Sequence, residues 1–91
     1  MEVELRLFAT FRERVGERTL DRAVAPGTTV RDLLAALEAD YPALDGELLD
    51  GEGTPPSVAV LHDGKRADLD AELTPDDRVS ICPPVTGGNG T

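Results

Sequence analysis

Over residues 2–8 the side chains alternate between an apolar face, Val3, Leu5 and Leu7, and a second face, Glu4, Arg6 and Phe8, and this period of two predicts a strand with one buried face. Residues 18–25 alternate less cleanly, because Arg22 lies between Leu20 and Val24 on one face. We expect this second strand to lie at the margin of the sheet, where the stem of Arg22 packs and its guanidinium reaches water. The segment between the two strands, residues 9–16, could hold one helical turn.

A period near 3.6 begins after Pro26-Gly27 and predicts an amphipathic helix. Thr29 and Asp32 have the spacing of a capping box, which marks the start of the helix. Pro42 ends the pattern, because the residue before a proline disfavours the α region. The apolar face of this helix consists of Val30, Leu33, Leu34, Leu37 and Tyr41.

Residues 57–62 and 78–82 return to a period of two, and Asp63-Gly64 is typical of a tight turn that leads into a short edge strand over residues 65–69. Residues 43–56 form a long connection. The predicted order is β-β-α-β-β-β, which indicates an α+β fold with a mixed sheet and one main helix across one face. The predicted core is Val3, Leu5, Leu7, Val30, Leu33, Leu34, Leu37, Val58, Val60, Val79 and Ile81.

Four apolar residues fall on outward positions of the predicted strands or just beyond them: Phe8, Ala59, Leu61 and Cys82. Apolar side chains gathered on one exposed face suggest a partner site. Scattered apolar residues on a surface are also common, and this alternative stays open.

The net charge of −9 argues against a nucleic-acid partner, because phosphates repel an acidic surface. The basic residues are eight arginines and a single lysine, Lys65. Such a composition suits either the salt-rich cytosol of a halophile or an ordinary acidic protein. The chain has no apolar run of membrane-spanning length and no signal-peptide pattern at its start, so we expect a cytoplasmic location and no membrane partner.

Cys82 and His62 are the only residues of their types. A lone cysteine forms no intrachain disulfide and no cysteine cluster for a metal, so we expect no bound metal. A Cys–His nucleophile pair is less plausible than structural roles for two residues in predicted strands. We therefore expect that the chain is not an enzyme by itself.

The segment that follows the last strand reads Pro83-Pro84-Val85-Thr86-Gly87-Gly88. Two prolines favour an extended exit, and two glycines can enter a channel that is too narrow for side chains. This ending is either a frayed terminus or a reactive one. The chain divides accordingly into a domain, residues 1–86, and a flexible tail, residues 87–91.

The predicted order and this ending together resemble the ubiquitin-like β-grasp proteins. Within them the chain is similar to the small subunit of molybdopterin synthase (MoaD), the thiazole sulfur carrier (ThiS) and the small archaeal modifier proteins. The resemblance covers nearly the whole chain. It rests on Leu7-Phe8-Ala9 leading to Arg12-Glu13 and Gly16, on Thr29-Val30-Arg31-Asp32-Leu33-Leu34, and on the Pro-Pro-Val-Thr-Gly-Gly ending.

The resemblance implies that a partner enzyme of the ubiquitin-activating type uses ATP and Mg²⁺ to adenylate the carboxylate of Gly88. Gly87, the neighbour of Gly88, then adds no side chain that could obstruct the reaction. Pro84 belongs to the partner-binding segment. The adenylate either accepts sulfur and serves molybdopterin synthase or passes to a lysine of a target protein. No cofactor is expected to bind the chain itself. A third possibility is an interaction domain with an inert tail.

Asn89-Gly90-Thr91 follows Gly88 and departs from the family's pattern. The carbonyl of Gly88 is then part of an amide, which cannot attack the α-phosphate of ATP. We therefore expect a precursor that a protease cuts after Gly88, unless the three residues are an artefact of cloning.

Overall fold

The computed structural model describes residues 1–51, 53, 55 and 58–83. The predicted tail, residues 87–91, and Pro84 lie outside these residues. The helical segments are α1 (Ala9–Val15), α2 (Val30–Asp40) and the 3₁₀ turn η1 (Pro42–Leu44). The strands are β1 (Glu2–Leu7), β2 (Thr19–Ala23), β3 (Ala59–His62), β4 (Lys65–Arg66) and β5 (Arg78–Cys82).

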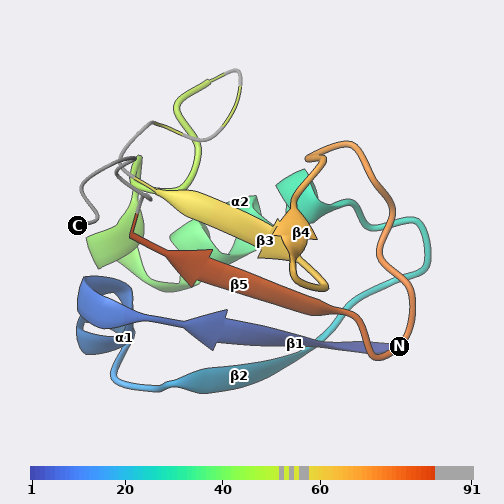
Figure 1. The fold of residues 1–91 in the computed structure, drawn as a ribbon, viewed down its shortest axis with the longest axis horizontal. Helices are drawn as coiled ribbons and strands as arrows, with labels where there is room; N and C mark the ends of the chain where they lie inside the picture. The colour runs from blue at the N-terminus through green and yellow to red at the C-terminus, as the bar shows by residue number, and fades with distance from the viewer. Residues whose placement is uncertain (52, 54, 56–57, 84–91) are drawn as a thin grey trace.

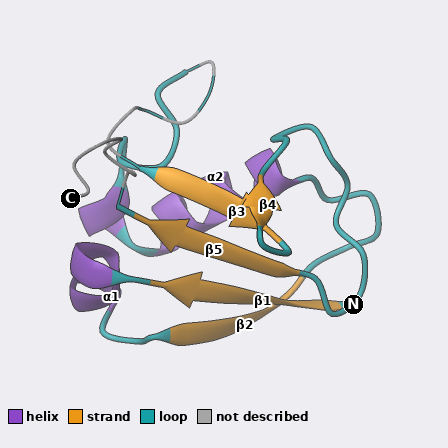
Figure 2. Ribbon diagram, in the orientation of Figure 1, coloured by secondary structure: helices purple, strands orange, loops and turns teal. Residues whose placement is uncertain are grey.

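The five strands form one mixed sheet in the order β2-β1-β5-β3-β4. The first and last strands of the chain, β1 and β5, are parallel neighbours, and the other pairs are antiparallel. Helix α2 crosses one face of this sheet, and α1 lies at the end of β1 (Figures 1 and 2). This architecture confirms the predicted α+β fold and its element order.

The core lies between the sheet and α2, and it contains all eleven residues that the sequence pattern predicts. The alternation in β1 and the 3.6-residue period in α2 direct these side chains toward each other. The structure adds four buried residues that the pattern did not assign to the core: Phe11, Leu44, Leu48 and Leu73. Phe11 comes from helix α1, and the other three come from η1 and the connecting segments; together they cover the ends of the core between the sheet and α2.

The start of α2 follows the predicted capping box. The hydroxyl of Thr29 accepts a hydrogen bond from the backbone N–H of Asp32, and the Asp32 carboxylate accepts one from the N–H of Thr29. The next two N–H groups of the helix, those of Val30 and Arg31, donate to carbonyls of the segment after β4. The helix terminus therefore leaves few donors unpaired.

Several local features differ from the sequence pattern. Helix α1 has seven residues rather than one turn, because Phe11 anchors it in the core. Strands β2, β3 and β4 are shorter than predicted. Glu38 lies off the predicted apolar face of α2 and is nevertheless half-buried, and its carboxylate accepts hydrogen bonds from two backbone N–H groups at 2.9 and 3.0 Å.

Two predicted margins of the sheet are confirmed. Strand β2 is an edge strand, where Arg22 is half-buried and pairs with Asp40 at the end of α2. Strand β4 forms the other edge and follows the turn at Asp63-Gly64. Both turn residues have positive φ, 53° and 88°, as a tight hairpin turn requires.

Candidate functional site

The candidate site is the face of the sheet that points away from α2, which we call the outer face. In each strand the residues between core positions point to this side, and strand register places them next to one another. Residues opposite each other in a pair share a face, so the pairs Ala59–Cys82 and Leu61–Ser80 join β3 to β5 on the outer face. The predicted partner-binding residues of these two strands are therefore neighbours.

The predicted residues differ in exposure. Ala59, Leu61 and Cys82 are half-buried, since adjacent side chains cover part of each. Phe8 follows β1 with extended backbone and is 42% exposed, the one exposed large apolar side chain among the described residues. It lines the same hollow as Arg6 and Ser80 of the outer face. The four residues thus form an apolar strip at the end of the sheet where β5 finishes.

Cys82 ends β5, the central strand of the sheet, and Pro83 is the last described residue. Partial burial raises the pKa of the Cys82 thiol, which favours its neutral form. This neutral thiol is a small apolar group on the strip rather than an activated nucleophile. Gly87 and Gly88 lie outside the described residues, but the chain leaves the sheet beside the apolar strip.

A charged cluster lies next to the apolar strip. The carboxylate of Glu4 in β1 contacts two guanidinium groups: the Nε atoms of Arg6 and Arg78 each lie 3.2 Å from one of its oxygens. Hydrogen bonds from Arg6 and then Arg78 lower the pKa of Glu4. Sequence reasoning missed this cluster, because the parallel pairing of β1 with β5 brings together residues 74 positions apart.

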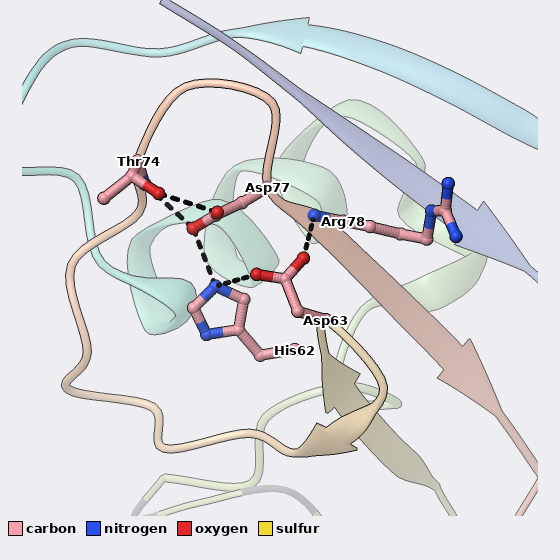
Figure 3. Close-up of polar contacts among 5 residues, drawn as sticks. All are labelled: His62, Asp63, Thr74, Asp77 and Arg78. Atoms are coloured by element: carbon pink, nitrogen blue, oxygen red, sulfur yellow. Dashed lines mark hydrogen bonds and ion pairs between the residues drawn. The ribbon is translucent and has the colours of Figure 1, made fainter.

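A second polar cluster lies at the opposite end of β5 (Figure 3). Asp77 is held by Thr74, whose hydroxyl and backbone N–H donate to its carboxylate at 2.7 and 2.9 Å, and by His62 Nε2 at 2.8 Å. Asp63 accepts a hydrogen bond from the N–H of Arg78 at 2.8 Å, and its other oxygen lies 3.8 Å from His62 Nε2.

His62, Asp63 and Asp77 offer three ligand atoms within 4.8 Å of one another, as a metal site would. The hydrogen bonds of the two carboxylates, however, already connect the β3–β4 turn, the loop before β5 and β5 itself. This pattern is that of a structural network which fixes the end of the sheet. The sequence offered no signal for it beyond the turn residues.

The sequence model of the ThiS family matches residues 5–88. The chain belongs to the ThiS family. This match confirms the resemblance predicted from sequence, and it ends at Gly88, the second glycine of the pair. Apart from Glu2 and Glu4, the residues of the outer face and the exit of β5 lie within the matched region.

Similar proteins extend the family assignment over nearly the whole chain. The small archaeal modifier protein 3 of Haloferax volcanii is 42% identical, with 97% of this chain and all of the relative covered. The crystal structure of small archaeal modifier protein 1 from Haloferax volcanii is similar with a TM-score of 0.82 and 34% identity, over 97% of this chain and all of the other.

A third similar protein is named for molybdopterin chemistry. It is the putative molybdopterin converting factor subunit 1 of Pyrococcus furiosus, with a TM-score of 0.78 and 27% identity over 93% of this chain and 99% of the other. The fold is thus the ubiquitin-like β-grasp. ThiS-family members of this kind are carriers and modifiers rather than catalysts, and this chain is one of them.

Within the described parts of the chain, the helices are too short and too polar to cross a lipid bilayer.

Proposed function

We propose that this protein is a ubiquitin-like sulfur carrier whose reactive group is the carboxylate of Gly88. The carboxylate oxygen attacks the α-phosphorus of ATP in a partner enzyme, and pyrophosphate leaves. A hydrosulfide-equivalent sulfur then attacks the acyl carbon and displaces AMP, which gives a thiocarboxylate. The carrier supplies a docking surface and a narrow tail, whereas the activating enzyme binds the Mg²⁺ and ATP.

The observation that carries this proposal is the position of the apolar strip beside the end of the central strand β5. An enzyme that holds Phe8, Leu61 and Cys82 receives the segment after Pro83 at a fixed starting point. Four residues from Val85 to Gly88 reach roughly 13 Å when extended, which is enough to enter an active-site channel. Gly87 and Gly88 carry no side chain that would block such a channel.

The name of the Pyrococcus relative favours molybdopterin synthesis as the pathway and the large subunit of molybdopterin synthase as the receiver of sulfur. The 42% identical relative is named a modifier, and this favours a second candidate function: the adenylate passes to a lysine of a target protein and forms an isopeptide bond. The two functions share the activation step and differ in the acceptor.

The activation step is tested with a purified activating enzyme of the ubiquitin-activating type, ATP and Mg²⁺. Three forms are compared: residues 1–91, residues 1–88, and residues 1–88 with Gly88→Val. We expect pyrophosphate release and a mass increase at the terminus with residues 1–88 alone. Equal adenylation of residues 1–91 without trimming would contradict the proposed need for a free Gly88 carboxylate and for a processing protease.

The acceptor is tested by mass spectrometry on the protein from its native cells. An intact chain that ends at Gly88 with one oxygen replaced by sulfur supports the carrier. A Gly-Gly remnant on lysines of other proteins supports the modifier. A chain that carries neither modification, in cells that make molybdopterin, supports an interaction domain with an inert tail.

A further inference from the structure

One ring nitrogen of His62 faces two carboxylates (Figure 3). The Nε2 atom lies 2.8 Å from Oδ2 of Asp77 and 3.8 Å from Oδ2 of Asp63. These three atoms all lie within 4.8 Å of one another. His62 and Asp63 belong to the hairpin of β3 and β4, whereas Asp77 belongs to the loop before β5. An imidazole nitrogen and two carboxylate oxygens therefore converge on one point from two separate segments of the chain.

The hydrogen bonds to the two carboxylates leave ligand positions free. Thr74 donates to both oxygens of Asp77, at 2.7 and 2.9 Å, and the backbone N–H of Arg78 donates to Oδ1 of Asp63 at 2.8 Å. Among the described residues, no hydrogen bond reaches Oδ2 of Asp63. Each carboxylate oxygen has two lone pairs, so Oδ2 of Asp77 keeps one beside the bond from Thr74. Hydrogen bonds of this kind hold the carboxylate ligands of metal ions in place.

The separations of the three atoms are close to those of a tetrahedral zinc site. Zn²⁺ binds imidazole nitrogen and carboxylate oxygen at about 2.0–2.2 Å, which places neighbouring ligand atoms roughly 3.4 Å apart. The distance from His62 to Asp77 is shorter than this value and the distance to Asp63 is longer, each by roughly half an ångström. A small movement of the His62 ring from Asp77 toward Asp63 corrects both distances.

The cluster is shielded from water on one side and open on the other. The side chains of Asp77 and His62 are 11% and 19% exposed, whereas that of Asp63 is 55% exposed. The open side gives an ion a path to the cluster and leaves a fourth position for a water molecule. Two carboxylates and a neutral imidazole carry a charge of −2, which one divalent cation neutralises. The net charge of the chain, −9, also favours the approach of a cation.

We propose that His62, Asp63 and Asp77 bind one Zn²⁺ ion through Nε2 and the two Oδ2 atoms. In the metal-free chain Nε2–H donates to Asp77, and the ion takes the place of this proton. The neutral ring then carries its proton on Nδ1, while the hydrogen bonds from Thr74 and Arg78 remain. The lone cysteine has no bearing on this site, because none of the three ligands is a thiol.

The bound ion strengthens the network that fixes this end of the sheet. It connects the hairpin of β3 and β4 to the loop before β5, so it binds the folded chain and not the unfolded one, and it stabilises the fold by mass action. The site lies at the end of β5 that is opposite to the apolar strip. Zinc binding therefore does not depend on the activation of Gly88, and its test needs no partner enzyme.

The experiment uses residues 1–91, freed of metal by a chelator that is then removed. Zn²⁺ alone is titrated by calorimetry, by thermal melting and by NMR of the imidazole nitrogens. His62 is the only histidine, so the ring signals are assigned without ambiguity. We expect one Zn²⁺ per chain, a ring proton on Nε2 before the titration and on Nδ1 after it, and a melting temperature that rises with the zinc concentration.

Two variants each remove one ligand. His62→Gln and Asp63→Asn should both weaken the Kd for Zn²⁺ at least about tenfold and abolish the rise in melting temperature. Asp63→Asn keeps an oxygen that accepts the N–H of Arg78, so the turn retains this contact. The matched control is Asp76→Asn, which removes the same charge from an exposed residue of the neighbouring loop. Its φ of 68° is tolerated by asparagine, and it should bind Zn²⁺ as the parent does.

Several results would overturn the proposal. If Zn²⁺ changes neither the ring nitrogens nor the melting temperature of the parent chain, the cluster is a hydrogen-bonded network only. A Kd that is the same in the parent and in both ligand variants means that Zn²⁺ binds to other surface carboxylates. An equal loss with Asp76→Asn indicates a bulk charge effect. If His62→Gln does not fold, Asp63→Asn and the ring nitrogens of the parent decide the question.

Discussion

The Nε2 atom of His62 lies 2.8 Å from Oδ2 of Asp77, and this contact joins the end of β3 to the loop that leads into β5. Thr74 holds the same carboxylate from the other side through its hydroxyl and its backbone N–H. The side chain of Asp77 is 11% exposed. A charged group with so little access to water depends on these donors.

Asp77 should make the protein sensitive to acid. Burial alone would raise the pKa of its carboxyl group, but the hydrogen bonds from Thr74 and His62 outweigh burial and lower the pKa from 3.8 to about 2. Because the pKa of Asp77 is lower in the folded protein than in the unfolded chain, the ionised carboxylate stabilises the fold at any pH above the unfolded pKa. This stabilisation is lost as pH falls from about 4 to about 2. We expect this group to contribute roughly 2 kcal/mol to the free energy of unfolding at neutral pH.

Urea denaturation between pH 2 and pH 7 measures this contribution. Asp77→Asn should lower stability at neutral pH and flatten the loss below pH 4, because the titrating group is gone. Asp21→Asn, an exposed carboxylate on β2, serves as the control and should keep the parent's acid profile. An unchanged acid slope in Asp77→Asn would contradict the assignment.

Glu38 should contribute to the stability of the fold, although it lies off the apolar face of α2. Its Oε2 atom accepts hydrogen bonds from the N–H groups of Leu48 and Leu49, which fixes the connection after η1 against the helix. Glu38→Ala leaves both donors unpaired and should cost about 1–3 kcal/mol. Glu38→Gln keeps an acceptor oxygen and should cost less. Thermal melting of the two variants beside Glu13→Ala, an exposed residue of α1, tests the difference, and equal midpoints for all three would refute it.

Leu34 lies at the centre of the core, with no exposed surface. Leu34→Ala should cost about 2–5 kcal/mol, because the truncated side chain leaves a cavity that the aliphatic layer fills only in part. For a domain of this size each kcal/mol corresponds to a fall in melting temperature of roughly 4–8 °C. Glu13→Ala is again the suitable surface control, since Glu38 is not a neutral site. A melting temperature equal to that of the control would contradict the core assignment.

Leu61 tests the apolar strip. Leu61→Asp places a charge between Ser80 and Arg66, its neighbours in the strand pairs, and should weaken binding of the activating enzyme without unfolding the domain. Thr19→Asp adds the same charge to the same face at the far edge strand and should bind as the parent does. Pull-down titration and circular dichroism measure binding and folding. Equal affinities for the two folded variants would exclude the strip as a docking surface.

Local patterns in the sequence predicted the regular elements well. The period of two in β1 and the capping box before α2 are consequences of backbone geometry, and the structure follows both. Strand β5 has the predicted bounds, Arg78–Cys82. The length of helix α1 was underestimated from the sequence. Its one buried residue is Phe11, and the residues around Phe11 show no helical period.

The polar clusters could not be predicted in the same way. Glu4 meets Arg78 through the parallel pairing of the two strands furthest apart in sequence, and His62 meets Asp77 through the pairing of β3 with β5. These contacts depend on strand order, whereas a sequence pattern reports only which face a residue occupies. The apolar strip was predictable because each member lies on an outward position, but its arrangement around β5 was not.

The central place of β5 also has a consequence for how the protein is made. A ribosome delivers β1 first and β5 last, yet the two must pair before the sheet is continuous. Contacts between such distant segments form slowly, because a long loop has to close before they are gained. Before residues 78–82 have left the ribosome, the nascent chain can form the strand pairs β1–β2 and β3–β4, but β5 is not there to join them into one sheet. The proposed reactive segment follows β5 directly in the sequence, so the folded body and the segment that the proposed activating enzyme would receive become available together.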